Sequence, residues 1–188
     1  MTVVSTSGFI KDRPQIALTG RGFIAETFSL IGANNTSAAL GATGANSTLC
    51  LTAIGLRAGD PVTGLAMFEG GTPQSGSTLF KYALFDKTGA SMLKVTADVT
   101  ANQAVNSFVL GAFSGGAYTV PVDDVYLCAV LSICSTTQPL FQRGPSVTGI
   151  GKSFNSGVRA CASVASQTDI TAGVTLADGV NAFWFGAY

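Results

Sequence analysis

The stretch LFKYALF, residues Leu79–Phe85, decides the fold class of this chain. Successive side chains of a β-strand point to opposite faces, so Phe80, Tyr82 and Leu84 would share one face. The alternate positions, where Lys81 is the only charged residue, would share the other face. Because both faces carry large apolar groups, we expect a strand in one sheet of a sandwich whose outer face is partly covered.

Similar stretches, rich in β-branched and aromatic residues, recur along the chain and are bounded by turn residues. Helix signals are scarce, because Gly or Pro interrupts nearly every window. We expect strands at Ala25–Leu30, Thr48–Ile54, Val62–Phe68, Leu79–Phe85, Met92–Ala97, Val105–Leu110, Val125–Ile133, Val158–Val164 and Ala182–Phe185. About nine short strands without a long helix predict an all-β, antiparallel two-sheet β-sandwich, and a jelly roll fits this number.

Glycine and proline mark the turns between these strands. Gly59, within Arg57–Pro61, stands where the backbone can adopt a positive φ easily. Glu69–Pro73 opens a loop, and Asp86–Gly89 is typical of a hairpin turn between two strands.

The N-terminal region differs in character from the rest of the chain, because its charges, Asp12 among them, follow no clear period. We expect residues 1–24 to form an extended arm for assembly contacts and residues 25–188 to form the jelly-roll domain. The arm residues expected at an interface are Phe9, Ile10, Lys11, Arg13 and Arg21.

No targeting or membrane segment is recognisable in the sequence. The N-terminus lacks the basic start and continuous apolar stretch of a secretory signal. The longest uncharged apolar stretch, residues 125–141, contains Ser, Thr, Gln and Pro and is too polar for the roughly 20 residues of a membrane helix. We therefore expect a protein made and used without export, with no membrane partner.

The composition indicates a surface that other molecules cover. Only 11% of the 188 residues are charged, whereas a soluble domain typically carries about 25%. Small polar residues, glycine and apolar groups must therefore cover much of the exterior. The 10 basic and 10 acidic side chains give a net charge of +0, which offers phosphates no long-range attraction, so we expect no nucleic-acid partner.

Known catalytic patterns fail in this sequence. There is no histidine, which removes the usual general base and the imidazole metal ligand. Gly149–Ser153 ends in the Gly-Lys-Ser of a phosphate-binding loop, but Ser146 stands where that loop requires its first glycine. Ser91 and Lys94 match Ser-x-x-Lys, yet they would point to opposite faces of a strand. We expect no enzyme activity and no cofactor.

Asp123 and Asp124 are the only adjacent acidic residues. They follow Val-Pro-Val, which favours a solvated turn without a metal, and a calcium site is the alternative.

Three of the four cysteines, Cys50, Cys128 and Cys161, lie in apolar or small-residue runs typical of reduced core thiols. A disulfide between Cys128 and Cys134 is the other alternative that the sequence leaves open.

The C-terminal stretch Phe183, Trp184, Phe185 and Tyr188 carries aromatic rings on both faces of its expected strand. One of these faces must be covered by something other than the domain's own core. The N-terminal arm and a neighbouring subunit are the two candidates, and we expect these four residues at an interface.

The stretch Thr48–Asp60, TLCLTAIGLRAGD, resembles the L-x-L-T-A-I-x-L-x-A-G-D segment of a β-sandwich domain that recurs in tailed-bacteriophage virion proteins. Later landmarks resemble that domain in the same order. They are Ala83–Asp86 before Gly89, then Tyr118–Pro121, and then Val125–Leu127 at the start of an apolar strand. The resemblance covers about Gly22 to Tyr188.

The resemblance implies a jelly-roll virion protein, often trimeric, and transfers no active-site residue. No fibre-shaft repeat precedes the domain, which favours a capsid decoration (cement) protein that binds the major capsid protein lattice and stabilises it. Such a protein would lie on the outer capsid surface of the virion, be made in the host cytoplasm and associate with itself as a homotrimer. The alternative is a tail-associated receptor- or glycan-binding head, with Gly70–Thr78 or Thr136–Val147 as its recognition loops.

Overall fold

The computed structural model describes residues 22–27, 36–41, 44, 46–144, 161–179 and 181–188. In these residues the regular structure is β-strand apart from one 3-10 helix, and no helix is long and apolar enough to cross a membrane. The elements are β1 (Ala25–Glu26), β2 (Thr36–Ala39), β3 (Ser47–Leu56), β4 (Pro61–Val62), β5 (Gly64–Glu69), β6 (Ser75–Phe85), β7 (Met92–Val95), η1 (Thr100–Asn102), β8 (Ser107–Ala112), β9 (Tyr118–Thr119), β10 (Asp124–Thr137), β11 (Leu140–Arg143), β12 (Cys161–Gln167), β13 (Ala177–Asp178) and β14 (Gly186–Ala187).

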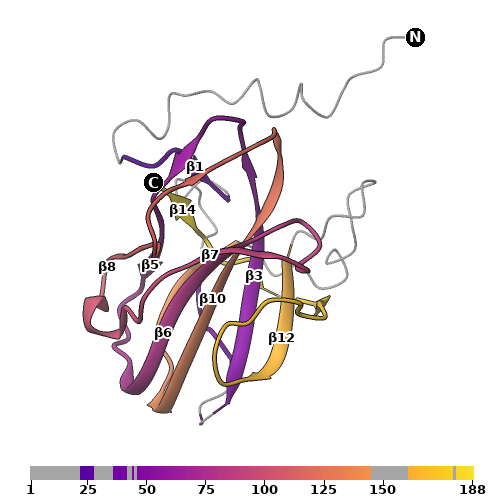
Figure 1. The fold of residues 1–188 in the computed structure, drawn as a ribbon. Coiled ribbons are helices and arrows are strands. Elements are labelled where there is room, and N and C mark those ends of the chain that lie inside the picture. The colour runs from indigo at the N-terminus through magenta and orange to yellow at the C-terminus, as the bar shows by residue number, and fades with distance from the viewer. Residues whose placement is uncertain (1–21, 28–35, 42–43, 45, 145–160, 180) are drawn as a thin grey trace.

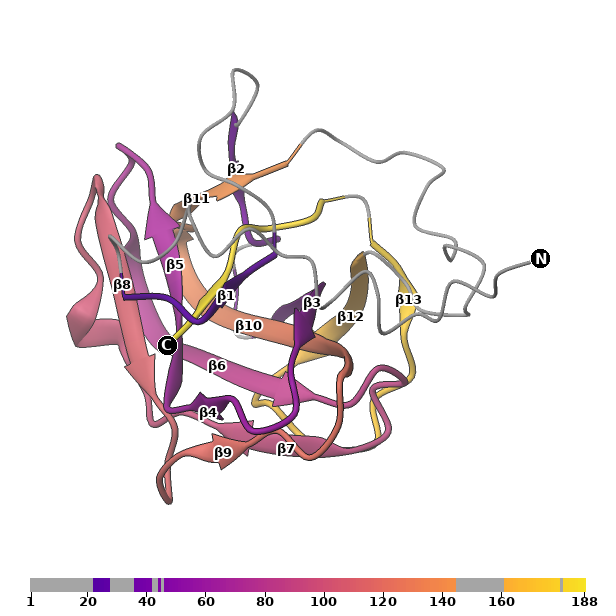
Figure 2. The ribbon, with the colours of Figure 1, turned by 90° about the horizontal axis from the view of Figure 1, so that it is seen from above.

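Eight of these strands form a jelly roll. Sheet A has the strand order β2-β11-β5-β8, and sheet B has the order β3-β10-β6-β7, with every pair antiparallel. Numbered one to eight along the chain, the strands lie in the orders 1-8-3-6 and 2-7-4-5, which is the jelly-roll arrangement of two Greek keys. The expected all-β sandwich is confirmed, and Figure 1 and Figure 2 show its two layers.

Short strands extend both sheets. In sheet B, β12 pairs with β3, and β13 pairs with β12. In sheet A, β14 pairs with the first half of β5, and β1 pairs with β14. On the same side of β5, β11 pairs with the last residue of β5, Glu69. The strands β4 and β9 form a separate two-stranded sheet. The end of the chain therefore belongs to sheet A.

The alternation expected for Leu79–Phe85 is confirmed. Phe80, Tyr82 and Leu84 pack in the core between the sheets, whereas Ala83 and Phe85 pack on the outer face of sheet B. The buried Tyr82 hydroxyl donates a hydrogen bond of 2.9 Å to the Val109 carbonyl of sheet A, which joins the layers. Burial raises the pKa of Tyr82 well above its usual value.

The outer face of sheet B has an apolar cover supplied by the chain itself. We call Thr168–Leu176, between β12 and β13, the covering segment, and in Figure 1 it is the yellow stretch that passes in front of β3. Ile170, Val174 and Leu176 from this segment pack with the buried side chains of the sheet. The Lys81 ammonium group holds the segment through Asp169, with N–O distances of 2.9 and 3.0 Å.

The turn predictions are confirmed. Gly59 has φ +89° in the turn after β3, and Gly89 has φ +76° in the hairpin between β6 and β7. The Gly89 amide donates to the Asp86 carbonyl, which closes that hairpin.

Two strands of the jelly roll, β2 and β11, are absent from the nine sequence-predicted strands. They read TSAA and LFQR and pair with each other over their full length. The expected last strand, Ala182–Phe185, is also displaced, because the ladder with β5 begins at Gly186.

Candidate interaction surface

The C-terminal residues are held between strands from distant parts of the chain. The amides of Phe183 and Phe185 donate to the hydroxyls of Thr52 and Thr27, each at 3.0 Å. The Trp184 amide donates to the Gln142 carbonyl at 2.9 Å. Phe183 and Phe185 join the core between the sheets, while Trp184 belongs to a cluster on the opposite face of sheet A.

That cluster forms what we call the aromatic face, on the outer side of sheet A. Phe23 packs edge-on against Trp184 at a centroid distance of 5.4 Å and against Phe108 at 5.4 Å. Phe108 continues the cluster to Phe68 at 5.2 Å. The aromatic face consists of Phe23, Ala66, Phe68, Phe108, Trp184 and Tyr188.

The exposed part of the aromatic face lies toward β5 and β8. Trp184 is fully buried, and Phe23 is 8% exposed, whereas Phe68 and Phe108 are half-buried. Leu110, which pairs with Ala66 across the sheet, is 44% exposed. Large apolar side chains are therefore accessible to solvent next to the buried rings of Phe23 and Trp184.

The aromatic face carries little charge. Within the strands of sheet A the only charged residues are Glu26, Glu69 and Arg143. Glu69 is buried, and Arg143 donates through Nη1 to Asn181 at 3.1 Å. Glu26 lies at the rim, where its Oε2 accepts a hydrogen bond from Trp184 Nε1 at 3.4 Å.

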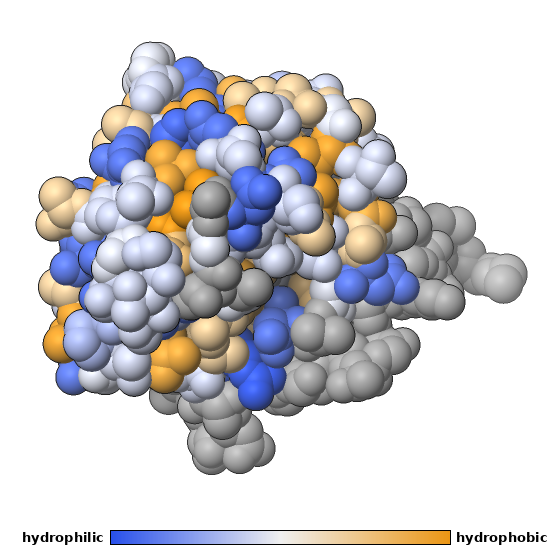
Figure 3. All heavy atoms as spheres, turned by 90° about the horizontal axis from the view of Figure 1, so that it is seen from below, coloured by the Kyte–Doolittle hydropathy of each residue, from blue (hydrophilic) through white to orange (hydrophobic). Residues whose placement is uncertain are grey.

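Other parts of the surface differ from the aromatic face. Seen from below, the molecule shows polar and apolar side chains interspersed in small groups (Figure 3). The remaining described charges lie in sheet B or in its loops: Arg57, Asp60, Lys81, Asp86, Lys87, Lys94, Asp98, Asp123, Asp124, Asp169 and Asp178. Among the described residues, sheet A therefore carries fewer charges than sheet B and its loops.

The last residue, Tyr188, ties the chain end to β5. Its backbone carbonyl accepts hydrogen bonds from the amides of Thr63 and Gly64 at 2.6 and 3.2 Å. Its ring lies against Gly64, where a Cβ would stand 2.3 Å from the Gly111 carbonyl oxygen and 2.6 Å from the Tyr188 hydroxyl. Partial burial raises the pKa of Tyr188.

The sequence-predicted interface residues fall into three groups, and one of them is Tyr188, which is partly buried on the aromatic face. Phe9, Ile10, Lys11, Arg13 and Arg21 lie outside the described residues. Phe183, Trp184 and Phe185 are at most 1% exposed in the single chain, so a partner could reach them only by displacing other parts of the chain. The sequence interpretation missed Phe23, Phe68, Phe108 and Leu110, whose side chains are brought together by pairing between β5, β8 and the chain end.

The expected recognition loops contain regular structure. Within Gly70–Thr78, β6 begins at Ser75, and within Thr136–Val147, β11 occupies Leu140–Arg143. Residues 145–147 lie outside the described part.

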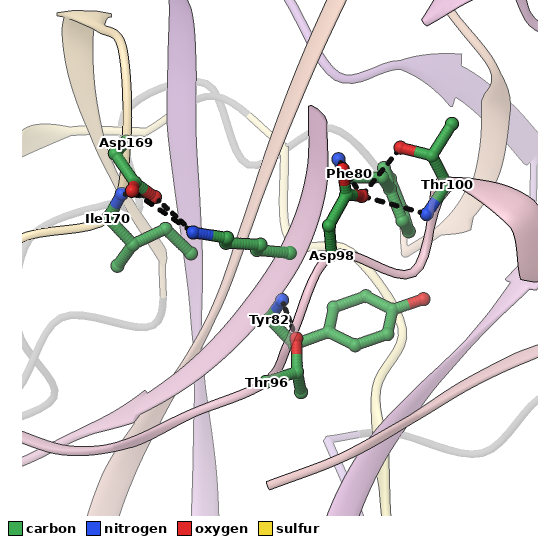
Figure 4. Close-up of polar contacts among 8 residues, drawn as sticks. Phe80, Tyr82, Thr96, Asp98, Thr100, Asp169 and Ile170 are labelled. Atoms are coloured by element: carbon green, nitrogen blue, oxygen red, sulfur yellow. Dashed lines mark hydrogen bonds and ion pairs between the residues drawn. The ribbon is translucent and has the colours of Figure 1, made fainter. Parts of the chain in front are cut away.

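The polar contacts around β6 are structural. Asp98 Oδ1 accepts hydrogen bonds from the Phe80 amide at 3.0 Å and from the Thr100 amide and hydroxyl at 2.9 and 2.6 Å. Figure 4 shows these contacts and those of Asp169 on the other side of the strand. Each carboxylate fixes a turn, and neither lies beside a nucleophile paired with a base.

The Asp123 and Asp124 carboxylates are engaged by the protein. Asp123 accepts the Ala58 amide at 2.8 Å, and Asp124 pairs with Lys87 at 2.9 Å. Within the described ranges, no group of three or more Cys, Asp or Glu residues is placed to hold a metal ion. Asp123 lies in the bend before β10, and Asp124 is the first residue of that strand.

All four cysteines are buried free thiols, so the structure contains no bond between Cys128 and Cys134. Burial raises the pKa of Cys50 to about 12 and raises those of Cys128 and Cys161 as well. Cys50 lines a small cavity of about 270 Å³ with Asp178 and Asn181, between β2 and β12. Its thiol donates to the Leu40 carbonyl at 3.3 Å, which leaves no activated nucleophile there.

Comparison with known proteins gives no relative: no protein-family model, no curated protein and no solved structure matches this chain.

Proposed function

We propose that this protein is a structural protein of a tailed-bacteriophage virion, a decoration protein that binds the outer surface of the major capsid protein lattice and stabilises it. Three features support the proposal. The Thr48–Asp60 stretch resembles virion β-sandwich domains, the eight core strands have jelly-roll order, and the composition is poor in charge. Self-association as a trimer is part of the same expectation.

The observation that carries the proposal is the aromatic face. It combines half-buried Phe68 and Phe108 with the exposed Leu110, and among the described residues Glu26 is the only charge at its rim. An uncharged apolar surface is suited to a lasting contact with another protein. Its burial removes apolar area from water and leaves no charge buried without a partner. We assign this face to the contact with the capsid lattice.

The N-terminal arm would extend the same contact. Phe23 belongs to the aromatic face, and the residues of the expected arm come directly before it in the sequence. Two weak contacts that are linked act together, because the second forms at high effective concentration once the first is made. Arm and face would then bind the shell as one unit.

The test uses purified shells from which the protein is absent. Wild-type protein should co-sediment with them, whereas a variant lacking residues 1–21 and the variant Leu110→Glu should each bind at least tenfold more weakly. Val122→Glu is the matched control, because Val122 is 54% exposed and lies in the loop before β10. Unchanged binding of both variants, with folding verified by circular dichroism, would contradict the proposal.

A tail-associated glycan-binding head is the competing function. Sugar recognition by stacking requires well-exposed rings, and no described Phe, Tyr or Trp side chain is more than about a third exposed. This finding favours the decoration role. Protein stoichiometry on purified virions separates the two, since hundreds of copies indicate the capsid and a handful indicate the tail.

A further inference from the structure

A cleft of about 270 Å³ lies at one open side of the sandwich, between β2 at the edge of sheet A and β12 and β13 at the edge of sheet B. All of its lining residues belong to the described part of the chain. At its mouth Ala39, Gly41 and Asp178 are exposed, whereas Leu40 and Phe183 on its floor are at most 1% exposed. The cleft is therefore open to solvent and has an apolar floor.

A half-buried cation, Arg143, stands beside this cleft. It ends β11, where it is opposite Phe183 in an isolated β-bridge. Its side chain shares a face of the strand with Phe141, which belongs to the core between the sheets, so the guanidinium group is directed toward the inside of the sandwich. The charge of Arg143 is therefore partly withdrawn from water at the side where the cleft opens.

The partners of Arg143 do not compensate this charge. Nη1 donates to Asn181 Oδ1 at 3.1 Å, and Nε is buried without a hydrogen-bond partner. Neither ion pair found among the described residues involves Arg143. Partly buried charges usually have a partner of opposite sign, because their lost hydration must be replaced. A guanidinium group is suited to a carboxylate in that role.

Asn181 connects the charge of Arg143 to the cleft. A guanidinium group has only donors, so the carboxamide atom that faces it must be the oxygen, and Nδ2 of Asn181 remains as a donor. Asn181 lines the cleft together with the hydroxyl-bearing Thr48 and Ser163. Hydrogen bonds in a chain polarise one another, so Arg143 makes Asn181 Nδ2 a stronger donor toward an anion.

The remaining lining restricts the class of anion. The floor residues Leu40, Ala162 and Phe183 favour a ligand with an apolar part. The cleft is smaller than the roughly 300–1,000 Å³ of sites for drug-sized ligands, so that part must be short. The Asp178 carboxylate at the mouth repels negative charge, which disfavours a doubly charged phosphate more than a singly charged carboxylate.

We propose that this cleft binds a small aliphatic monocarboxylate. The carboxylate accepts a hydrogen bond from Asn181 Nδ2, and the aliphatic chain contacts Leu40 and Phe183. Arg143 is a positioning residue, which fixes the Asn181 carboxamide and supplies the positive charge behind it. The cleft shares no residue with the aromatic face, so this inference goes beyond the proposed function.

The test is a titration of the full chain with butyrate at constant pH and ionic strength, followed by NMR at the Asn181 side-chain amide. We expect saturable shifts of this amide, and binding about tenfold weaker for butyramide, the neutral analogue. Arg143→Gln should also weaken butyrate binding about tenfold. Lys94→Gln is the matched control and should bind like wild type, because Lys94 lies in β7, at the opposite edge of sheet B from β13.

Three results would overturn the proposal: no saturable shift at Asn181, equal affinity for butyrate and butyramide, or tighter binding of inorganic phosphate than of butyrate. The comparison of butyrate with butyramide needs no variant, so it holds even where Arg143→Gln does not fold. Shell binding is not measured in this titration, so the carboxylate site and the proposed function can fail independently.

Discussion

Phe23 packs edge-on against Trp184, with ring centroids 5.4 Å apart and ring planes at 73°. These residues are 161 positions apart in the sequence, and each stands within a few residues of the end of the described chain. Their contact joins the residues before β1 to the residues before β14 on the outer side of sheet A. The fluorescence of Trp184, the only tryptophan in the sequence, should therefore report whether these two terminal segments are packed together.

Phe23→Ala should uncover Trp184 and lower the free energy of unfolding by about 3 kcal/mol, a usual cost for removing a buried phenylalanine ring. The measurements are chemical denaturation and the emission maximum of Trp184, which should move to longer wavelength. Val122→Ala, at an exposed site, should change the stability by less than about 0.5 kcal/mol. An unchanged emission maximum in Phe23→Ala would show that the ring does not shield Trp184.

The covering segment should depend more on its apolar contacts than on its ion pair. Ile170 is 6% exposed, so Ile170→Ala should cost about 2–4 kcal/mol. Lys81→Met should cost at most about 1 kcal/mol, because the paired Asp169 side chain is 52% exposed. Thermal unfolding of both variants checks this order, and a larger loss in Lys81→Met would refute it.

Acid should weaken the same ion pair. Partial burial acts to raise the pKa of Asp169, but the hydrogen bond from Lys81 and the Ile170 amide outweigh it and lower the pKa. The stabilisation is thus present above the ordinary aspartate pKa and is lost as the pH falls through the lowered value. The stability difference between wild type and Asp169→Asn should shrink below about pH 4, and a difference that grows there would contradict this account.

Gly64 should tolerate no side chain. A Cβ there would stand 2.3 Å from the Gly111 carbonyl oxygen, which belongs to the paired strand and cannot move alone. Gly64→Ala should therefore cost about 1–3 kcal/mol. Gly71→Ala is the control, since its Cβ would find only Asn106 Oδ1 at 3.7 Å, and equal unfolding midpoints for the two variants would count against the clash.

The four thiols should be unreactive in the native protein. All are buried, and the pKa of Cys50 is raised to about 12, so little thiolate forms at pH 8. Titration with a thiol-specific disulfide reagent should give fewer than one reactive group per native chain and four after denaturation without reductant. Two groups after denaturation would reveal a disulfide and restore the Cys128–Cys134 alternative.

The elements that the sequence predicted correctly are those whose signal lies within a few neighbouring residues. The sequence predicted correctly which side chains of Leu79–Phe85 share a face of the sheet. Shifting the strand by one residue would exchange its two faces, so the alternation of large side chains fixes which of them enter the core. The hairpin at Asp86–Gly89 was predictable because glycine meets a backbone requirement that few other residues satisfy. In contrast, β2 and β11 were missed because TSAA and LFQR are short and lack a repeating apolar pattern.

By itself, then, the sequence determined the all-β class and the two-layer packing, since the alternation of apolar side chains is a property of residues that are neighbours in the sequence. Only the tertiary structure decided which rings form the aromatic face. Phe23, Phe108 and Trp184 meet because strand pairing between distant segments sets their positions.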